Sequence, residues 1–229
     1  MSERENIIGR IREALKVEAA RPGHAHGEGL PHVQELPNTA TMRRSLPPGR
    51  DELDEKLRLF KKNAADLRAE FLLLKDTDEM LSTVLGLRDS ENWTRIGTHR
   101  GELTDSVSDR LKLPVCRTDG PYEASDLENC SVGITQCDAL VAQTGSVLVS
   151  SHSAGGRALS VLPPHHLILA RRTQMLRDLP EAFDLLKKRY APNYPSFISF
   201  ITGPSRTGDI ERILVLGAHG PKKLTILCI

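Results

Sequence analysis

From residue 51 onwards, short β-rich runs alternate with segments of helical periodicity, and this alternation limits the folds open to the chain. Apolar residues at helical spacing predict helices over 51–69, 78–87 and 179–190, and residues 71–74 either finish the first helix or begin a strand. The other β-rich runs lie at 94–97, 113–116, 132–135, 146–150, 167–170, 197–201, 213–216 and 224–229. We expect an α/β domain with a mainly parallel sheet, because parallel strands need crossover connections that are usually helical. The last three runs have no full helix between them, which predicts some antiparallel pairing at one edge of a mixed sheet.

Residues 1–50 differ from the rest of the chain in composition. Apolar residues at helical spacing predict an amphipathic helix over residues 2–20. Residues 21–50 are rich in proline and glycine and show almost no periodicity, which is typical of a linker or of a segment draped over a surface. We therefore expect an N-terminal helical extension and linker over 1–50 and one folded domain over 51–229.

The charge balance and the cysteine spacing exclude several classes of protein. A formal net charge of +1 and 4% aromatic residues favour neither nucleic-acid binding nor attraction to an anionic membrane. No apolar run approaches the roughly 18 residues of a membrane span, and the charged first residues differ from a secretory leader, so we expect a cytoplasmic protein. Cys116, Cys130, Cys137 and Cys228 form no CxxC pair and match no zinc or iron–sulfur spacing. We predict no metal site and no bound cofactor.

A segment rich in glycine, serine, threonine and arginine lies between the last β-rich runs. Its backbone N–H groups, hydroxyl groups and guanidinium are the donors that bind anions, although the same residues could serve only to turn the chain. Arg206 is the first candidate, and the other candidate ligand-binding residues of this segment are Gly203, Ser205, Thr207, Asp209 and Gly220. His219 is the only nearby acid–base group with a useful pKa, so it is the candidate catalytic residue.

Three further places in the sequence are candidates for a ligand site. Thr144, Gly145 and Ser146 form a predicted turn that either only turns the chain or also lines a ligand site. The segment 151–157 resembles an anion-binding loop, or is a plain connection between elements. His165 and its neighbour point to opposite faces of a strand, so only one of them can face a ligand, and His165 is our candidate. We expect these residues to converge with Arg206 and His219 at the carboxyl ends of parallel strands, where such sheets bind ligands.

Two blocks of the sequence resemble the LUD-domain family. The stretch TGPSRTGDIE followed by LVLGAHGPKKL, within residues 202–224, matches the family signature almost fully, and residues 133–146 match in part. In the second block, Gln143 stands where the family usually has an acid, and Ser146 replaces a threonine. The resemblance implies a Rossmann-like three-layer α/β/α fold, which ribose-5-phosphate isomerases, glucosamine-6-phosphate deaminases and CoA transferases share.

The resemblance also implies a function. Members of the family act in the oxidation of L-lactate to pyruvate together with iron–sulfur-bearing partner proteins, so we expect a subunit or accessory protein of lactate utilization that binds a small anionic ligand. The alternative is a free-standing enzyme of the CoA transferase or sugar-phosphate isomerase type, acting on a small phosphorylated, acyl or carboxylate metabolite. Neither the residues nor the resemblance assigns a catalytic step to this chain.

Overall fold

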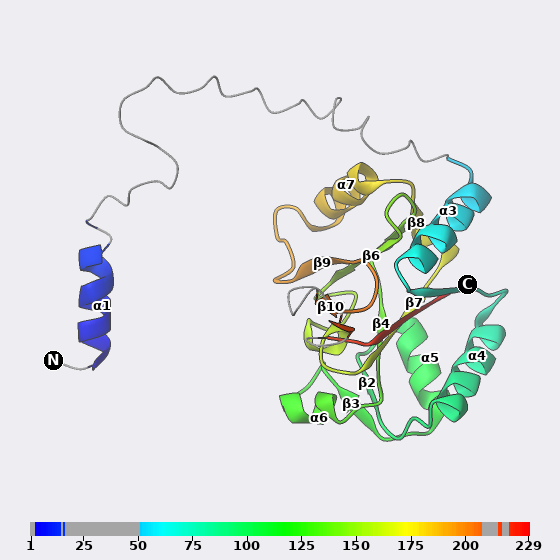
Figure 1. Cartoon of the computed structure of the whole chain (residues 1–229), viewed down its shortest axis with the longest axis horizontal. Coiled ribbons are helices and arrows are strands. Elements are labelled where there is room, and N and C mark those ends of the chain that lie inside the picture. Colours follow the sequence, from blue (N-terminus) through cyan, green and yellow to red (C-terminus); the bar gives the residue numbers. More distant parts are fainter. Residues whose placement is uncertain (1–2, 15, 17–50, 208–214, 217–219) are drawn as a thin grey trace. The chain divides into compact units, whose positions relative to one another are not determined.

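The computed structural model of the chain describes residues 3–14, 16, 51–207, 215–216 and 220–229 (Figure 1). Helix α1 (Glu3–Ala14) belongs to one compact unit, and the elements from α3 (Leu53–Asp66) onwards belong to another. The predicted N-terminal helix is confirmed over the residues of α1. The predicted linker lies outside the described residues, and the domain boundary at residue 50 stays a prediction.

The centre of the larger unit is a six-stranded sheet in which every pairing is parallel. In spatial order its strands are β1 (Glu70–Leu73), β12 (Lys223–Cys228), β7 (His165–Ala170), β4 (Val132–Gln136), β2 (Ile96–Thr98) and β3 (Val115–Arg117). Every residue of β7 is buried, as expected for a central strand covered on both faces. Most of the residues that could finish the first helix or begin a strand form β1.

Helices α4 (Thr77–Ser90) and α5 (Glu102–Leu111) cover one face of this sheet (Figure 1). Asp76 begins α4 by accepting the backbone N–H of Glu79 at 3.0 Å, as an N-cap residue does. The two helices share a buried core with apolar residues of β2, β4, β7 and β12. Helix α5 is absent from the predicted helices, although its buried residues Leu103, Val107 and Leu111 have helical spacing.

The opposite face is covered by α3 and by a second, four-stranded sheet. In spatial order this second sheet contains β8 (Met175–Leu176), β5 (Ala139–Val141), β6 (Ser146–Ser150) and β9 (Ile198–Ile201). One of its faces shares a core with Leu57, Phe60 and Ala64 of α3. Its other face packs against α7 (Leu179–Tyr190), which confirms the predicted helix over 179–190.

The predicted α/β class with a mainly parallel sheet is confirmed, but the antiparallel strands are not at an edge of that sheet. The antiparallel pairs β5–β6 and β6–β9 belong to the second sheet, where β8 joins β5 in parallel. Strands of two and three residues such as β8 and β5 carry too little pattern to be recognised in a sequence.

The remaining described elements are α6 (Ala124–Glu128), single 3₁₀ turns at Ala158–Ser160 and Arg172–Gln174, and the antiparallel pair of β10 (Arg206–Thr207) with β11 (Val215–Leu216). Among the described helices, none combines the length and the apolar character needed to cross a bilayer.

Candidate functional site

The order of the parallel strands creates a switch point between the neighbours β2 and β4. Strand β2 is followed through α5 by β3 on one side, whereas the next strand of this sheet after β4 is β7 on the other side. Connections that leave in opposite directions open a space at the carboxyl ends of the two strands, where open α/β sheets bind ligands. The residues at these ends are His99, Arg100, Gly101 and Gln136, and together with Gly155 we call them the carboxyl-edge cluster.

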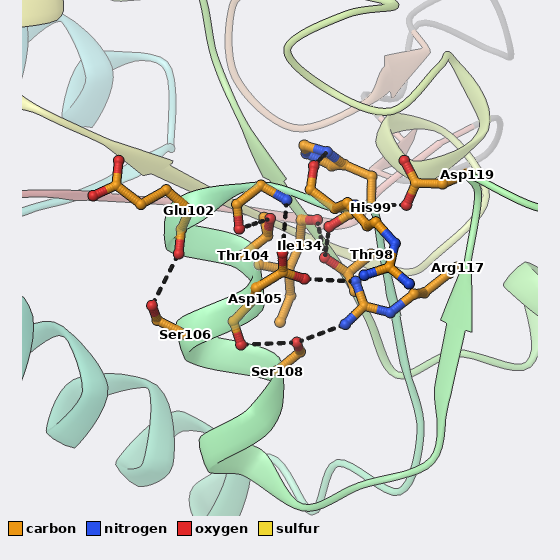
Figure 2. Close-up of polar contacts among 12 residues, drawn as sticks. Thr98, His99, Glu102, Thr104, Asp105, Ser106, Ser108, Arg117, Asp119 and Ile134 are labelled. Carbon is orange, nitrogen blue, oxygen red and sulfur yellow. Dashed lines mark hydrogen bonds and ion pairs between the residues drawn. The ribbon is translucent and has the colours of Figure 1, made fainter.

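His99 is the buried ionisable group of this cluster (Figure 2). Its Nδ1 lies 2.8 Å from the carbonyl oxygen of Arg100, which can only accept a hydrogen bond, so Nδ1 carries the proton. Its Nε2 accepts the backbone N–H of Gln136 at 3.3 Å. Burial lowers the pKa of His99 below its usual value, which agrees with the neutral ring that these two hydrogen bonds require.

Gly101 brings the first turn of α5 against the end of β4. A Cβ at this position would lie 2.0 Å from Nε2 of Gln136, so only glycine leaves the amide side chain in place. The first hydrogen bond of α5 runs from the N–H of Asp105 to the Gly101 carbonyl at 2.8 Å. The N–H of Gly101 donates to the Asp105 carboxylate at 3.2 Å, and the positive end of the helix dipole favours negative charge beside this first turn.

Two arginines beside the cluster differ in whether they are already paired. Arg117 donates from Nη1 to Asp105 at 2.8 Å and from Nη2 to Ser108 at 3.3 Å (Figure 2). Burial opposes ionisation of Asp105, but the hydrogen bonds from Arg117 and from the Gly101 N–H outweigh it and lower the pKa of Asp105. Arg100 is exposed, and its guanidinium makes no ion pair within 4.0 Å of a described residue, although its charge also helps to lower the pKa of Asp105 and its backbone N–H donates to the Asp119 carboxylate.

The loop 151–157 covers the cluster from the side of the second sheet. Gly155 has φ of +62°, and a Cβ there would lie 2.2 Å from Cβ of His99. Thr118 donates to the Gly155 carbonyl at 2.7 Å, and Ser153 donates to the buried carboxylate of Asp138 at 2.7 Å. The middle of the loop is thus held in place at Ser153 and at Gly155, and Gly155 lies directly against His99. The predicted anion-binding loop lies beside a group of polar residues that sequence reasoning did not select.

Chemically, the carboxyl-edge cluster combines hydrogen-bond donors, one unpaired cation and one neutral imidazole. The donors are the α5 N-terminus and the Gln136 amide, and the cation is Arg100. This set suits a small anion such as a carboxylate, which accepts hydrogen bonds and needs a compensating charge. His99 is neutral, but both of its ring nitrogens are hydrogen-bonded within the protein, so Nε2 accepts a substrate proton only in exchange for the Gln136 N–H.

The residues predicted from the sequence fall into two groups in the structure. The turn Thr144–Ser146 rests on α3, because Asn63 donates to the carbonyls of Ala142 and Gln143 at 2.9 and 3.0 Å. Gly145 has φ of +65°, the left-handed conformation that glycine adopts without strain. The hydroxyl of Thr144 is buried without a hydrogen-bond partner in the described part of the chain.

The segment Gly203–Arg206 joins this first group. The hydroxyls of Ser146 and Thr202 lie 2.8 Å apart, and a Cβ on Gly203 would lie 2.6 Å from the Leu67 carbonyl just after α3. The N–H of Ser205 donates to the carbonyl of Pro221 at 2.9 Å, next to Gly220. These contacts lie at the residues that precede β1 and β12, so the group meets the amino ends of the parallel strands. The expected position was the carboxyl ends, because a sequence shows that a loop flanks a strand without showing at which edge of the sheet it meets other loops.

His165 lies apart from that group, at the first residue of β7 and on the face covered by α4. Its Nδ1 lies 2.8 Å from a carboxylate oxygen of Glu91, and its Nε2 lies 3.0 Å from the hydroxyl of Thr225. Lys223 bridges the carboxylates of Glu91 and Glu70 at 2.6 and 3.4 Å. The histidine is buried, with both ring nitrogens bonded within the protein. Burial lowers its pKa, while the neighbouring Glu91 acts in the opposite direction.

The structure describes only one of the remaining three predicted site residues. Thr207 is the second residue of β10, whereas Asp209 and His219 lie outside the described residues. Ligand binding stays a prediction for the other candidate residues, which are Thr144, Gly145, Ser146, Gly203, Ser205, Arg206 and Gly220. Among the described residues, no group of three or more histidine, cysteine, aspartate or glutamate side chains is arranged to hold a metal ion.

The sequence carried one signal for the carboxyl-edge cluster. Thr98-His99-Arg100-Gly101 follows a short β-rich run and precedes the helical spacing of α5, which is the pattern of a strand, a polar loop and a helix N-terminus. Recognising α5 would have drawn attention to this loop. The approach of Gln136 and Gly155 to it has no local signal, since both residues come from later parts of the chain.

Fold and site together define an α/β protein with a polar cluster at the switch point of a parallel sheet. Residues 123–229 match the model of the LUD domain family, which confirms the resemblance to that family. A crystal structure of a DUF162 family protein from Deinococcus radiodurans has a similar fold, with a TM-score of 0.60 over 78% of this chain and 99% of that chain, at 17% identity. At this identity the likeness concerns the fold alone.

Several curated proteins are similar to part of the chain. Lactate utilization protein C of Bacillus subtilis is 34% identical over 112 residues, which is 48% of this chain and 47% of that protein. Lactate utilization protein C of Anoxybacillus flavithermus is 34% identical over 102 residues, 44% of this chain and 45% of that protein. The uncharacterized protein YkgG of Escherichia coli is 35% identical over 112 residues, 48% of each chain. The match therefore spans about half the length of the curated relatives.

Proposed function

We propose that this protein takes part in lactate utilization as a subunit or accessory protein that binds a small anionic ligand. The observation that carries the proposal is the similarity of about 34% identity to proteins named lactate utilization protein C. On this proposal the oxidation of L-lactate to pyruvate takes place with iron–sulfur-bearing partner proteins in the cytoplasm. This chain contributes ligand binding rather than electron transfer.

The carboxyl-edge cluster is the place in the fold that best suits such a ligand. Arg100 supplies an unpaired positive charge, and the first turn of α5 supplies N–H groups beside the Gln136 amide. L-lactate and pyruvate are small carboxylates, so both match this set of donors. The segment Gly203–Gly220 with Arg206, predicted from the sequence, is the second place to test.

Isothermal titration of the purified chain with L-lactate and with pyruvate tests both places. Arg100→Gln should raise Kd about tenfold, because loss of a charge-assisted hydrogen bond costs about 1.5 kcal/mol at an exposed position. Arg58→Gln removes an exposed arginine from α3 and serves as the matched control, with an unchanged Kd. If Arg206→Ala weakens binding and Arg100→Gln does not, the ligand binds at the segment predicted from the sequence.

A genetic experiment tests the role in lactate utilization separately from the binding site. Deleting the gene should abolish growth on L-lactate as sole carbon source, and the wild-type gene should restore it. Normal growth of the deletion strain, in a host with no second copy, would contradict the proposed role. If genes encoding Arg100→Gln and Arg206→Ala each restore growth, lactate utilization does not need either proposed anion site. The proposed role in lactate utilization would still stand.

A free-standing enzyme acting on a small phosphorylated, acyl or carboxylate metabolite is the second candidate. The observation that favours it is His99, a buried and neutral imidazole at the switch point. On this reading Nε2 of His99 gives up its hydrogen bond from the Gln136 N–H and acts as a general base on a bound substrate. Turnover of such a metabolite by the isolated chain, lost in His99→Gln, would favour the enzyme over the accessory subunit.

A further inference from the structure

Among the described strands, β9 is the outer strand of the second sheet, and its edge away from β6 borders an apolar groove. In the described residues β9 pairs only with β6. A groove of about 600 Å³ lies beside it, lined by Phe183, Leu186 and Lys187 of α7, by Tyr194, and by residues 198–200 of β9. Phe183 and Tyr194 are 58% and 52% exposed, the two highest values among the described large apolar residues of the larger unit.

The register of β9 shows which of its backbone groups are free. Val149 pairs with Ser199 in antiparallel register, and the N–H of Ser151 donates to the Phe197 carbonyl at 2.9 Å. In an antiparallel pair the bonded residues alternate, so Phe197, Ser199 and Ile201 direct their backbone groups towards β6. The N–H and carbonyl groups of Ile198 and Phe200 therefore point away from β6, towards the free edge.

The side chains of those same two residues face the helix. Ile198 and Phe200 pack with the core beneath α7, and the rings of Phe183 and Phe200 lie 5.6 Å apart. The edge thus offers a ladder of hydrogen-bonding groups next to an apolar groove with a helix on its far side. That is the geometry in which an extended peptide adds as a further strand and places alternate side chains in the groove.

Charge decides between the possible occupants. Lys187 lines the groove, is exposed and makes no ion pair with a described residue, and Lys188 follows it in the last turn of α7, whereas Arg189 is already paired with Asp138 at 2.7 Å. A second copy paired antiparallel through β9 would bring its own Lys187 and Lys188 to the same face of the joined sheet. An acidic segment would instead compensate the charge of Lys187.

We propose that the groove between α7 and β9 docks an extended segment of a partner protein by strand addition. The segment has apolar side chains at alternating positions and an acidic residue that meets Lys187. This docking surface is on a different part of the molecule from the carboxyl-edge cluster. It does not depend on which anion the protein binds.

Amide hydrogen exchange on the whole chain tests whether the edge is free. The N–H groups of Ile198 and Phe200 should exchange at least tenfold faster than those of Ser199 and Ile201, because only the latter two donate to β6. Slow exchange at Ile198 and Phe200 in the free protein would show that the edge is already occupied, and would overturn the proposal.

Peptide selection tests the occupant. We would select a phage-displayed library of 12-residue peptides on the immobilised whole chain and measure Kd for the enriched peptides. Alternating apolar residues with a flanking acid are the expected pattern. Ile198→Pro should raise Kd at least tenfold, because it deletes the one free donor at this position, while Ile198→Ala keeps that N–H and is the matched control. Phe183→Asp should also raise Kd at least tenfold.

Three results would overturn the proposal. The first is a failure to enrich any peptide, and the second is equal binding of the peptides to Ile198→Pro and Ile198→Ala. The third is a dimer in sedimentation velocity that Phe183→Asp dissociates, because a second copy would then be the occupant. Circular dichroism and melting temperature of each variant separate lost binding from lost folding. Phe183 and Lys187 are exposed, so substitutions at these two positions keep the test available if the proline variant does not fold.

Discussion

Acid should destabilise this protein through His166 in particular. The imidazole is 1% exposed on the face of β7 that packs towards α3 and the second sheet. Its Nε2 lies 2.9 Å from the Thr135 hydroxyl, and its Nδ1 has no hydrogen-bond partner among the described residues. A charged ring there would be desolvated with no carboxylate to compensate it, and burial lowers the pKa of His166 to about 3.

The sign and size of the effect follow from the difference between the two states. In the unfolded chain the histidine has a pKa near 6.5, so between about pH 6.5 and pH 3 the unfolded state binds a proton that the folded state does not. The free energy of unfolding therefore falls as the pH decreases through this window, by about 1.4 kcal/mol per pH unit. From pH 7.5 to pH 4.5 His166 alone should remove roughly 2.7 kcal/mol.

Urea unfolding followed by the fluorescence of Trp93, the single tryptophan, measures this loss. The wild type and His166→Gln are compared at pH 7.5 and at pH 4.5. Glutamine can keep a hydrogen bond to Thr135 but does not titrate. The wild type should lose about 2–3 kcal/mol more than the variant between the two pH values. Carboxylates and the other buried histidines, His99 and His165, titrate in both proteins and cancel in the comparison.

Equal losses in the two proteins would refute the reasoning. That result would mean that His166 is solvated or paired in the folded state. If His166→Gln is too unstable to measure at pH 4.5, the titration of the His166 ring protons by NMR in the wild type gives the same answer. A midpoint above about pH 5 would contradict the burial argument.

Two further predictions concern the loop that covers the carboxyl-edge cluster. Gly155→Ala should lower the free energy of unfolding by about 2 kcal/mol more than Gly156→Ala in urea unfolding. Both glycines have positive φ, but only Gly155 would place a Cβ against His99, and an equal effect would contradict the close approach. Asp138→Asn should lower the free energy of unfolding by about 2–4 kcal/mol, because the buried carboxylate accepts hydrogen bonds from Ser153, Arg189 and Tyr190. The same substitution should make loop 151–157 sensitive to protease, since the bond to Ser153 is part of this network. Unchanged proteolysis of the loop would show that Asp138 does not hold it in place.

The local pattern of the sequence determined most of the elements of this protein. The helix over 179–190 has the predicted bounds, because Asp178 caps its start by accepting the N–H of Glu181 and its apolar residues recur at helical spacing. The opposite orientation of His165 and His166 also follows from the sequence alone, since successive side chains of a strand point to opposite faces. One of these rings lies against Glu91 and the other against Thr135.

The tertiary structure alone decided which residues meet. The antiparallel pairs β5–β6 and β6–β9 form a second sheet that β8 joins in parallel, and the pairing of strands as short as β5 and β8 depends on distant partners. His99 contacts Gln136 and Gly155 only because the strand order places β2 beside β4 and the loop after β6 against both. Hydrophobic periodicity is a property of neighbouring residues, so it indicates helices and strands. Strand order depends on how those elements bury their faces against one another, and so a sequence pattern does not contain it.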